Sequence, residues 1–150
     1  MLRQILFGGG INLINIAIHA LLMTFVVRVA RRADARTKLR SAFLLVAVMI
    51  PTVSVLMITH TFEVFVWALA YALVNAAPAE PFGDLVYFAF VNYTTLGYGD
   101  IIPIVRWRLL GPMTAMNGVL LFGWSTAVIF EVLRKTLERL EISRQTSDRS

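Results

Sequence analysis

The residues best suited to chemistry in this sequence are those at 94–100, which read Thr-Thr-Leu-Gly-Tyr-Gly-Asp. Gly97 and Gly99 alternate with residues that carry side chains, and glycine adopts backbone angles that other residues avoid. This alternation lets successive carbonyl groups point the same way, towards one axis. A stack of carbonyl oxygens replaces the hydration shell of a monovalent cation, and the Thr95 hydroxyl can extend the stack at its inner end. The segment therefore predicts a binding path for cations that is built from backbone oxygens.

No part of the sequence indicates catalysis. Cysteine is absent, which excludes disulfides, thiolate metal ligands and cysteine nucleophiles. The two histidines, His19 and His60, are too far apart in the sequence to predict a metal ligand set, and no nucleophile, base and acid stand together. We therefore expect no enzyme activity, no catalytic residue and no cofactor, and no metal ion other than the cation of the 94–100 segment.

The rest of the chain must place this segment in apolar surroundings. Of its 150 residues, 58% are hydrophobic and 15% are charged, and the mean hydropathy is +0.73. Soluble domains contain about 45–50% apolar and about 25% charged residues, and so short a chain has too little interior to bury this much apolar surface. The composition excludes an ordinary soluble enzyme and indicates a protein whose partner is the lipid bilayer.

Uncharged runs predict the membrane-spanning elements. A helix needs about 20 apolar residues to cross the hydrocarbon core, and the runs at 4–27, 41–62 and 109–130 are long enough, whereas 64–79 is marginal. Residues 85–99 are also uncharged, but they are too few to cross and are interrupted by glycine. We expect this last run to enter the membrane and return on the same side.

A short helix is expected to lead into the 94–100 segment. Pro81 and Gly83 break the preceding span, and Asp84 is a good N-cap for a helix over 84–94. Such a helix is too short to cross, so it must return as non-helical backbone, which a membrane tolerates only where protein covers it or it lines a water-filled path. The negative end of its dipole then favours a cation in that path.

Basic residues gather in two places and set the expected orientation. Arginine and lysine are enriched in membrane proteins on the cytoplasmic side, so we place both clusters there and expect no nucleic-acid partner despite the net charge of +5. The first cluster is Arg28, Arg31, Arg32, Arg36, Lys38 and Arg40, and the second is Arg134, Lys135, Arg139, Arg144 and Arg149.

An even number of crossings must separate two clusters on the same side. The run at 109–130 is one crossing, so residues 41–77 should make one more. A single helix of that length measures about 55 Å at 1.5 Å per residue, which predicts a kink at Pro51, a strong tilt or a portion along the interface. The alternative is two helices that turn near 59–61.

Residues 94–100 resemble the selectivity-filter signature of potassium channels, with Leu96 where valine or isoleucine is commoner. The resemblance covers roughly residues 57–135, including the short helix and the helix after Gly111 and Pro112. It implies an all-α integral membrane protein with transmembrane helices, a re-entrant pore helix and a filter loop, four copies of which surround one pore. The implied function is passive conduction of K⁺ in the plasma membrane. The alternatives are a weakly selective cation channel and a non-conducting regulatory or scaffold subunit.

The resemblance also assigns roles to residues. The filter would be Thr95, Leu96, Gly97, Tyr98 and Gly99, with K⁺ bound at the first four. Thr94, Asp100 and Tyr87 would support it, since Asp100 can reach Tyr87, whereas Val91 stands where some relatives carry a buried acid. Gly118 and Gly123 are gating candidates, because inner helices of such channels bend at a glycine. Tight helix packing is an equal alternative for both.

Two further polar groups fall within the apolar runs. His60 and Glu63 share a helical face and are candidates for pH-sensitive gating, although we prefer a mutually satisfied structural pair. Asn12, Asn15 and His19 also share a face and predict contacts with other helices rather than with lipid.

The expected organisation has three parts. Residues 1–40 form the first transmembrane helix and a basic loop. Residues 41–135 form the pore module, and 134–150 a cytoplasmic tail. Within the module we expect an outer helix at 41–77, a pore helix at 84–94, the filter at 95–99 and an inner helix at 111–133.

Overall fold

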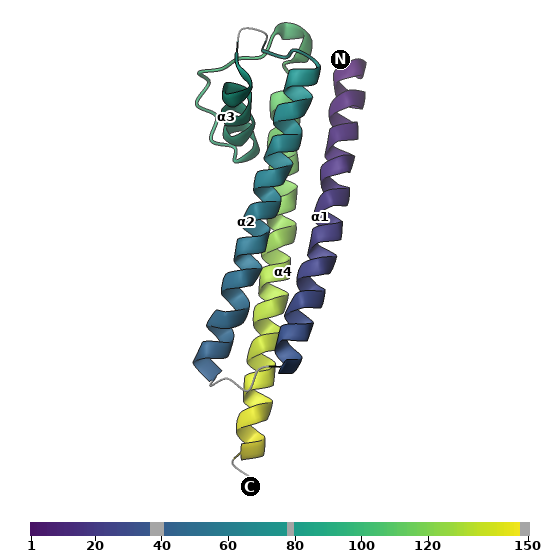
Figure 1. Ribbon diagram of the computed structural model, residues 1–150. Coiled ribbons are helices and arrows are strands. Elements are labelled where there is room, and N and C mark those ends of the chain that lie inside the picture. Colours follow the sequence, from purple (N-terminus) through teal and green to yellow (C-terminus); the bar gives the residue numbers. More distant parts are fainter. Residues whose placement is uncertain (37–40, 78–79, 148–150) are drawn as a thin grey trace.

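The computed structural model describes residues 1–36, 41–77 and 80–147 (Figure 1). Three of the basic residues counted above, Lys38, Arg40 and Arg149, lie outside the described residues. In the described part the chain forms helices and no strand. The elements are α1 (Leu2–Arg36), α2 (Ser41–Leu73), α3 (Phe82–Tyr93), a 3₁₀ turn η1 (Val105–Trp107) and α4 (Leu110–Ser147).

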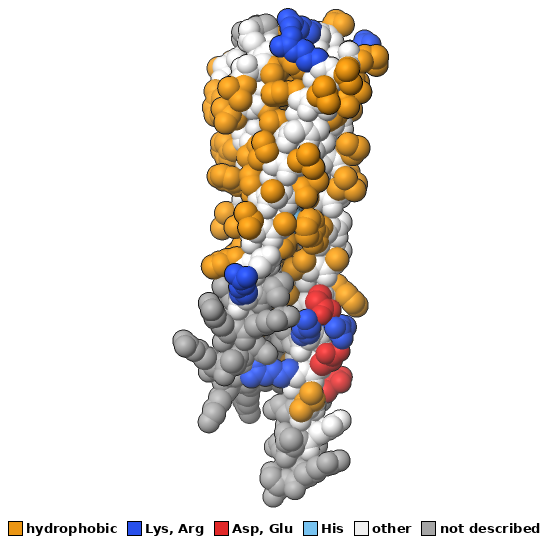
Figure 2. Space-filling view, turned by 90° about the vertical axis from the view of Figure 1, so that its right-hand side faces the viewer, with side chains coloured by type: hydrophobic (Ala, Val, Ile, Leu, Met, Phe, Trp, Pro, Cys, Tyr) orange, Lys and Arg blue, Asp and Glu red, His pale blue; other side chains and the backbone are white. Residues whose placement is uncertain are grey.

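The three long helices lie side by side as an elongated bundle, with α2 antiparallel to α1 and α4 (Figure 1). Three stretches are long and apolar enough to cross a membrane. They are Leu2–Val26 in α1, Phe43–Leu73 in α2, and Val105–Ile142, which takes in η1 and most of α4. Figure 2 shows hydrophobic side chains covering the middle of one face, with basic side chains at both ends and acidic ones at one end. The chain is therefore an all-helical, multi-pass membrane protein, and lipid solvates the exposed apolar side chains.

α2 is one continuous helix with Pro51 inside it. It passes through 59–61 without a break, so the alternative of two helices turning there is wrong. It ends at Leu73 rather than at 77, because Asn75 takes the left-handed conformation (φ 51°) and the Ala76 N–H donates to the Tyr71 carbonyl at 3.0 Å. This is the pattern of a Schellman cap, which asparagine can form.

α3 begins earlier than the sequence predicted. Its N-cap is Pro81, with no side-chain capping bond, so the prediction that Asp84 caps the helix is wrong. Proline has a fixed φ suited to a helix start, and Asp84 lies instead in the first turn, where its charge favours the helix dipole. The helix ends at Tyr93, and α4 runs on to Ser147, well beyond the inner helix expected at 111–133.

The segment between α2 and α4 enters and returns at one end of the bundle. α3 leads back along α2 until the Tyr93 hydroxyl reaches the Glu63 carboxylate, about 15 Å below the end of α2 at 1.5 Å per residue. The chain then returns, and the Ile104 N–H donates to the Ala76 carbonyl at 2.9 Å. The expected re-entrant path is present, with α3 as its descending limb.

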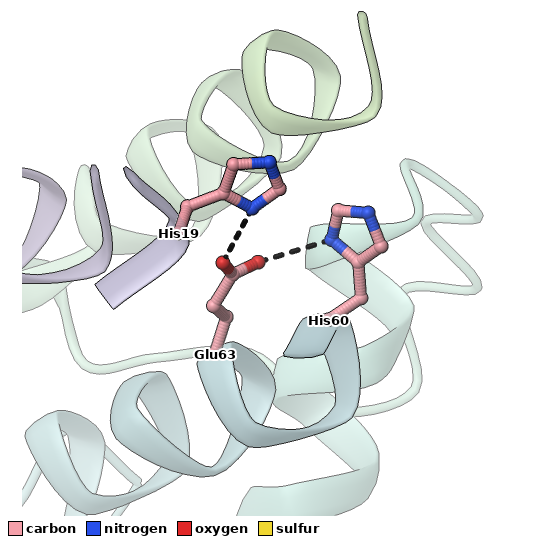
Figure 3. Close-up of side chains that lie close together, drawn as sticks. All are labelled: His19, His60 and Glu63. Carbon is pink, nitrogen blue, oxygen red and sulfur yellow. Dashed lines mark hydrogen bonds and ion pairs between the residues drawn. The ribbon is translucent and has the colours of Figure 1, made fainter. Parts of the chain in front are cut away.

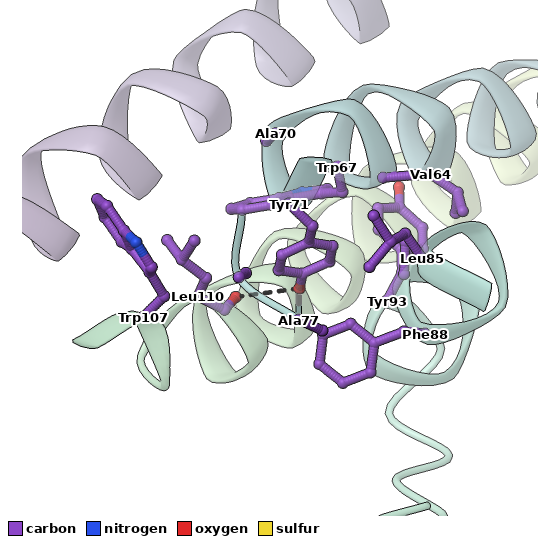
Figure 4. Close-up of a cluster of buried hydrophobic side chains, with 13 residues drawn as sticks. Val64, Trp67, Ala70, Tyr71, Ala77, Leu85, Phe88, Tyr93, Trp107 and Leu110 are labelled. Atoms are coloured by element: carbon purple, nitrogen blue, oxygen red, sulfur yellow. Dashed lines mark hydrogen bonds between the residues drawn. The ribbon is translucent and has the colours of Figure 1, made fainter. Parts of the chain in front are cut away.

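The main hydrophobic core holds this re-entrant unit in place (Figure 4). It joins residues of α2, α3, η1 and the start of α4, and Tyr71 lies at its centre. The Tyr71 ring packs 4.9 Å from Phe88 of α3 between ring centroids, and its hydroxyl is hydrogen-bonded to the Thr114 hydroxyl of α4 at 2.5 Å. The labelled members in Figure 4 are Val64, Trp67, Ala70, Tyr71, Ala77, Leu85, Phe88, Tyr93, Trp107 and Leu110.

Candidate functional site

The backbone of the 94–100 segment alternates in hand. The φ angle is positive at Thr95 (62°), Gly97 (62°) and Gly99 (77°), and it is not positive at Leu96 or Tyr98. Alternate residues therefore differ in the sign of φ, which is the alternation expected of a backbone whose carbonyl groups line one axis. Positive φ is unusual for a β-branched residue, and the N–H group of Thr95 is hydrogen-bonded to the Asn92 carbonyl.

The N–H groups of this segment are tied to the end of α3. The Thr95 N–H donates to the Asn92 carbonyl at 2.9 Å, and the N–H groups of Leu96 and Gly97 donate to the Val91 carbonyl at 2.9 and 3.3 Å. Among the residues that the structure describes, no donor is paired with the carbonyl oxygens of 95–98. The N–H groups of Thr95, Leu96 and Gly97 are thus bonded to α3, and the carbonyl oxygens of 95–98 are not.

The side chains on either side of the segment hold it to α3. The Thr94 hydroxyl donates to the Phe90 carbonyl at 2.8 Å. The Tyr87 hydroxyl donates to Asp100 Oδ2 at 2.7 Å, which confirms that Asp100 reaches Tyr87. This bond lowers the pKa of the Asp100 carboxyl, and in return the acceptor carboxylate raises the pKa of Tyr87 to about 12. Both ends of the segment are therefore anchored to the same short helix.

A second polar site lies deep in the bundle, below the 94–100 segment (Figure 3). His19 Nδ1 is 2.8 Å from Glu63 Oε1, and His60 Nδ1 is 3.0 Å from Glu63 Oε2. His19 and Glu63 are completely buried, and the His60 side chain is 11% exposed. Helix packing thus brings together two histidines that the sequence separates, and Glu63 is shared between them rather than paired with His60 alone.

Two residues that the sequence analysis missed complete this cluster. The Tyr93 hydroxyl donates to Glu63 Oε2 and lies 3.0 Å from His60 Nδ1. The Ser125 hydroxyl lies 2.9 Å from His60 Nε2 and 3.4 Å from His19 Nε2. In the sequence, Tyr93 and Ser125 are only polar residues inside apolar runs. The one signal that could have linked them to Glu63 is that antiparallel helices would place all three at a similar depth in the membrane.

The cluster meets a distance test for a metal site. The nitrogen and oxygen donors of His19, His60 and Glu63 all lie within 4.8 Å of one another, so our expectation that the histidines were too far apart is wrong. Tetrahedral zinc sites with bonds of about 2.0–2.1 Å, however, hold their donors about 3.3 Å apart. The N···O separations of 2.8 and 3.0 Å are those of hydrogen bonds, so the cluster fits protons between its donors.

A neighbouring set of hydrogen bonds from side-chain amides joins α1 to α2 and α4. Asn15 Nδ2 donates to Asn117 Oδ1 of α4 at 3.0 Å and to the Glu63 carbonyl at 3.2 Å. Trp67 Nε1 also donates to Asn117 Oδ1, at 3.0 Å. Asn15 and His19 are buried, whereas Asn12 is partly exposed. The predicted polar face of α1 therefore contacts helices.

The two gating candidates of α4 have different surroundings. A Cβ atom on Gly118 would lie 2.0 Å from the Tyr93 carbonyl oxygen, whereas one on Gly123 would meet nothing within 4 Å. Gly118 therefore lets α4 pack directly against the end of α3. Gly123 makes no such contact and keeps its place as a hinge candidate.

Comparison with known protein families bears on the same region. A family described as ion channel matches residues 43–135, which is more than half of the 150 residues. The match takes in α2 from Phe43, α3, the 94–100 segment and most of α4. No individual curated protein and no solved structure matches the chain. The chain belongs to the ion channel family.

Proposed function

We propose that this chain forms a potassium-selective channel in which four copies surround one pore. The observation that carries the proposal is the backbone of 95–99, where φ alternates in sign and the N–H groups of Thr95, Leu96 and Gly97 are bonded to α3. The resulting row of free carbonyl oxygens suits a dehydrated monovalent cation. K⁺ would bind at Thr95, Leu96, Gly97 and Tyr98, and Gly99 would complete the filter.

The exposure of the filter supports the assembly of several copies. In the single chain Leu96 is 55% and Tyr98 67% exposed, although both stand in the middle of the proposed conduction path. One chain can surround an ion on one side only, so further copies must supply the other carbonyl rows. Four copies follow from the resemblance of residues 94–100 to potassium channel filters.

The substitution of leucine for the commoner valine does not change the proposed chemistry. Leu96 would bind K⁺ through its backbone carbonyl, and its N–H is bonded to the Val91 carbonyl. Its side chain takes no part in that bond. Thr94, Tyr87 and Asp100 would support the filter through the contacts described above.

The bundle also suggests an orientation in the plasma membrane. Gln4 Oε1 accepts from the Leu109 N–H at 3.0 Å, so the start of α1 lies at the end where the chain re-enters. Leu44 of α2 packs near Val132 of α4 at the other end, and Val132 is followed by Arg134 and Lys135 of the second basic cluster. We place both basic clusters in the cytoplasm and the filter at the outer side.

Purified protein in liposomes tests this function through the reversal potential in mixed K⁺ and Na⁺. We expect the potential to follow the K⁺ gradient. Gly97→Ala should abolish selective flux, because alanine is strained at a φ of +62°,. The matched control is Gly9→Ala, since Gly9 lies in α1 with nothing within 4 Å of an added Cβ.

The same measurement separates the alternatives. Near-equal permeability to Na⁺ and K⁺ would contradict selectivity and indicate a weakly selective cation channel. An absence of flux from folded, reconstituted protein would contradict conduction and indicate a regulatory or scaffold subunit.

A further inference from the structure

The buried cluster, of which Figure 3 draws His19, His60 and Glu63, takes side chains from all four α-helices. α1 contributes His19, α2 contributes His60 and Glu63, α3 contributes Tyr93 and α4 contributes Ser125. Ionisable groups inside a membrane are costly and are functional candidates. The hydrogen bonds between these five side chains allow the protons of the cluster to be counted.

The count begins with the nitrogens that face the carboxylate. An ionised carboxylate only accepts hydrogen bonds, so His19 Nδ1 and His60 Nδ1, at 2.8 and 3.0 Å from Glu63, must each carry a hydrogen. The Tyr93 hydroxyl also donates to Glu63. If the cluster held no further proton, both imidazoles would be neutral and both Nε2 atoms would be hydrogen-bond acceptors.

The contacts of the two Nε2 atoms with Ser125 cannot all be satisfied when both imidazoles are neutral. Both Nε2 atoms face the Ser125 hydroxyl, at 2.9 and 3.4 Å, and a hydroxyl has one hydrogen to donate. One imidazole can accept it, and the second must then donate its own Nε2–H to the serine oxygen. All the contacts are satisfied together when the cluster holds one additional proton.

That proton is shared by the cluster. If it moves to Glu63, the carboxylic acid donates to His19 Nδ1, His19 Nε2–H donates to Ser125, and every contact is again satisfied. The two arrangements contain the same number of protons, so the titration is a property of the coupled groups. In both arrangements the net charge is zero.

Burial favours the neutral count. His19 and Glu63 are fully buried, and an uncompensated charge in such a place is strongly unfavourable. Without the proton the cluster carries one negative charge, and with a second proton it carries one positive charge. Among the described residues, the cluster's other ring contacts are with Phe122 and Trp124 of α4, and neither side chain titrates.

We propose that His19, His60 and Glu63 form a binding site for one proton, which holds α1 and α4 to the end of the short helix α3. Its regulatory consequence, which rests on the proposed channel function, is that conduction depends on pH. Tyr93 lies two residues before Thr95 of the filter, and Ser125 lies two residues after Gly123 of the hinge candidate. Acidification that adds a second proton therefore loosens contacts to both.

The proton can be counted directly, because the chain has only two histidines. We would label histidine with ¹⁵N in protein held in lipid nanodiscs and follow both imidazoles between about pH 5 and 8, where histidine usually titrates. Infrared spectroscopy would detect a protonated Glu63, identified by loss of its band in Glu63→Gln. We expect the imidazolium and carboxylic acid signals at neutral pH to sum to one proton per chain.

A measured count other than one proton per chain would overturn the proposal. Two neutral imidazoles without a carboxylic acid give zero protons, and two imidazoliums with an ionised Glu63 give two. Displacement of the proton by Zn²⁺ alone at micromolar concentration would also overturn it, in favour of a metal site. The imidazole part of the count needs only the wild-type chain, so it stands even if Glu63→Gln fails to fold.

The regulatory part is tested by K⁺ flux across the same pH range. We expect wild-type flux to fall on acidification, as the cluster of each chain takes up its second proton. His19→Gln should flatten the response. Asn15→Ala is the matched control, because it removes another buried contact of α1 without removing a titratable group, and it should keep the wild-type pH profile.

Failure of this inference differs from failure of the channel function. Flux that is constant from about pH 5 to 8, with one proton counted, would overturn the regulation. A chain that passes no K⁺ at any pH contradicts the proposed channel, while the proton count remains measurable.

Discussion

Single residues decide how closely the short helix approaches the inner helix. Gly118 of α4 faces the Tyr93 carbonyl, where an added Cβ would lie only 2.0 Å from the oxygen. Tyr93 is the last residue of α3, and the 94–100 segment begins immediately after it. The position of the row of carbonyl oxygens is therefore set by the absence of a side chain on another helix.

We expect Gly118→Ala to destabilise the protein by about 1–3 kcal/mol, because backbone atoms must move to admit the methyl group. Thermal unfolding in detergent measures this loss. Gly123→Ala is the matched control and should unfold near the wild-type temperature, since nothing lies within 4 Å of its Cβ. Equal stability of the two variants would contradict the packing role of Gly118. Unchanged open probability in Gly123→Ala would contradict the hinge.

The hydrogen bond between Tyr87 and Asp100 is lost at low pH and again at high pH. The pKa of Asp100 is lowered by this bond, so the contact is complete above the ordinary aspartate pKa of about 3.9 and is lost as the pH falls through the lowered value. The pKa of Tyr87 is raised to about 12. At the alkaline end the contact is therefore complete below about pH 10 and is lost as the pH rises through about 12.

Tyr87→Phe should raise the pKa of Asp100 towards its ordinary value, because the hydroxyl that stabilises the ionised carboxylate is gone. The carboxylate ¹³C resonance of Asp100, titrated in nanodiscs, measures this change, and Asp100→Asn identifies the resonance. An unchanged midpoint would contradict the hydrogen bond.

At the scale of elements, α1 is tied to the ion channel module by polar contacts inside the bundle. All of α1 precedes the matched residues 43–135. It reaches α4 through Asn15 and Asn117 and reaches α2 through His19 and Glu63. Hydrogen bonds between membrane helices specify which faces meet, since lipid leaves little hydrophobic preference between them.

Asn15→Ala should weaken the docking of α1. Such bonds contribute about 0.6 and at most about 1.7 kcal/mol in a membrane protein, and we expect a loss in that range from unfolding in mixed micelles. Asn12→Ala is the matched control, because Asn12 Oδ1 is buried without a hydrogen-bond partner, and it should cost nothing or stabilise. An equal loss in both variants would contradict the specific role of Asn15.

At the scale of the whole molecule, the two ends of the bundle differ in chemistry. The start of α1 and the 94–100 segment share one end, and the end of α4 lies at the other (Figure 1). Glu131, Arg134, Lys135 and Glu138 form ion pairs near that second end. The bundle therefore has a defined direction across the membrane.

This direction is testable because the chain contains no cysteine. In intact cells a membrane-impermeant maleimide should label Ile102→Cys, where the native side chain is 76% exposed, and should not label Arg28→Cys until the cells are opened. Labelling of Arg28→Cys from outside would contradict the cytoplasmic placement of the basic clusters.

Local chemistry made several features predictable from sequence. The apolar runs predicted the three long helices because each run must satisfy its own backbone within lipid. The return of the chain after α3 followed from a helix too short to cross. The ends were less predictable: α2 stops at a cap formed by Asn75, and α3 starts at Pro81 rather than at Asp84, because several nearby residues could have served.

The sequence by itself determined that this chain lies in a membrane and where its spans fall, because composition and spacing along the chain control both of these. Only the tertiary structure decided that His19 meets Glu63 and that Gly118 admits the Tyr93 carbonyl. Those meetings depend on the depth and rotation of one helix against another. In lipid, buried polar contacts and the close approach of backbones select that arrangement. Neither can be predicted from the spacing of residues along one helix.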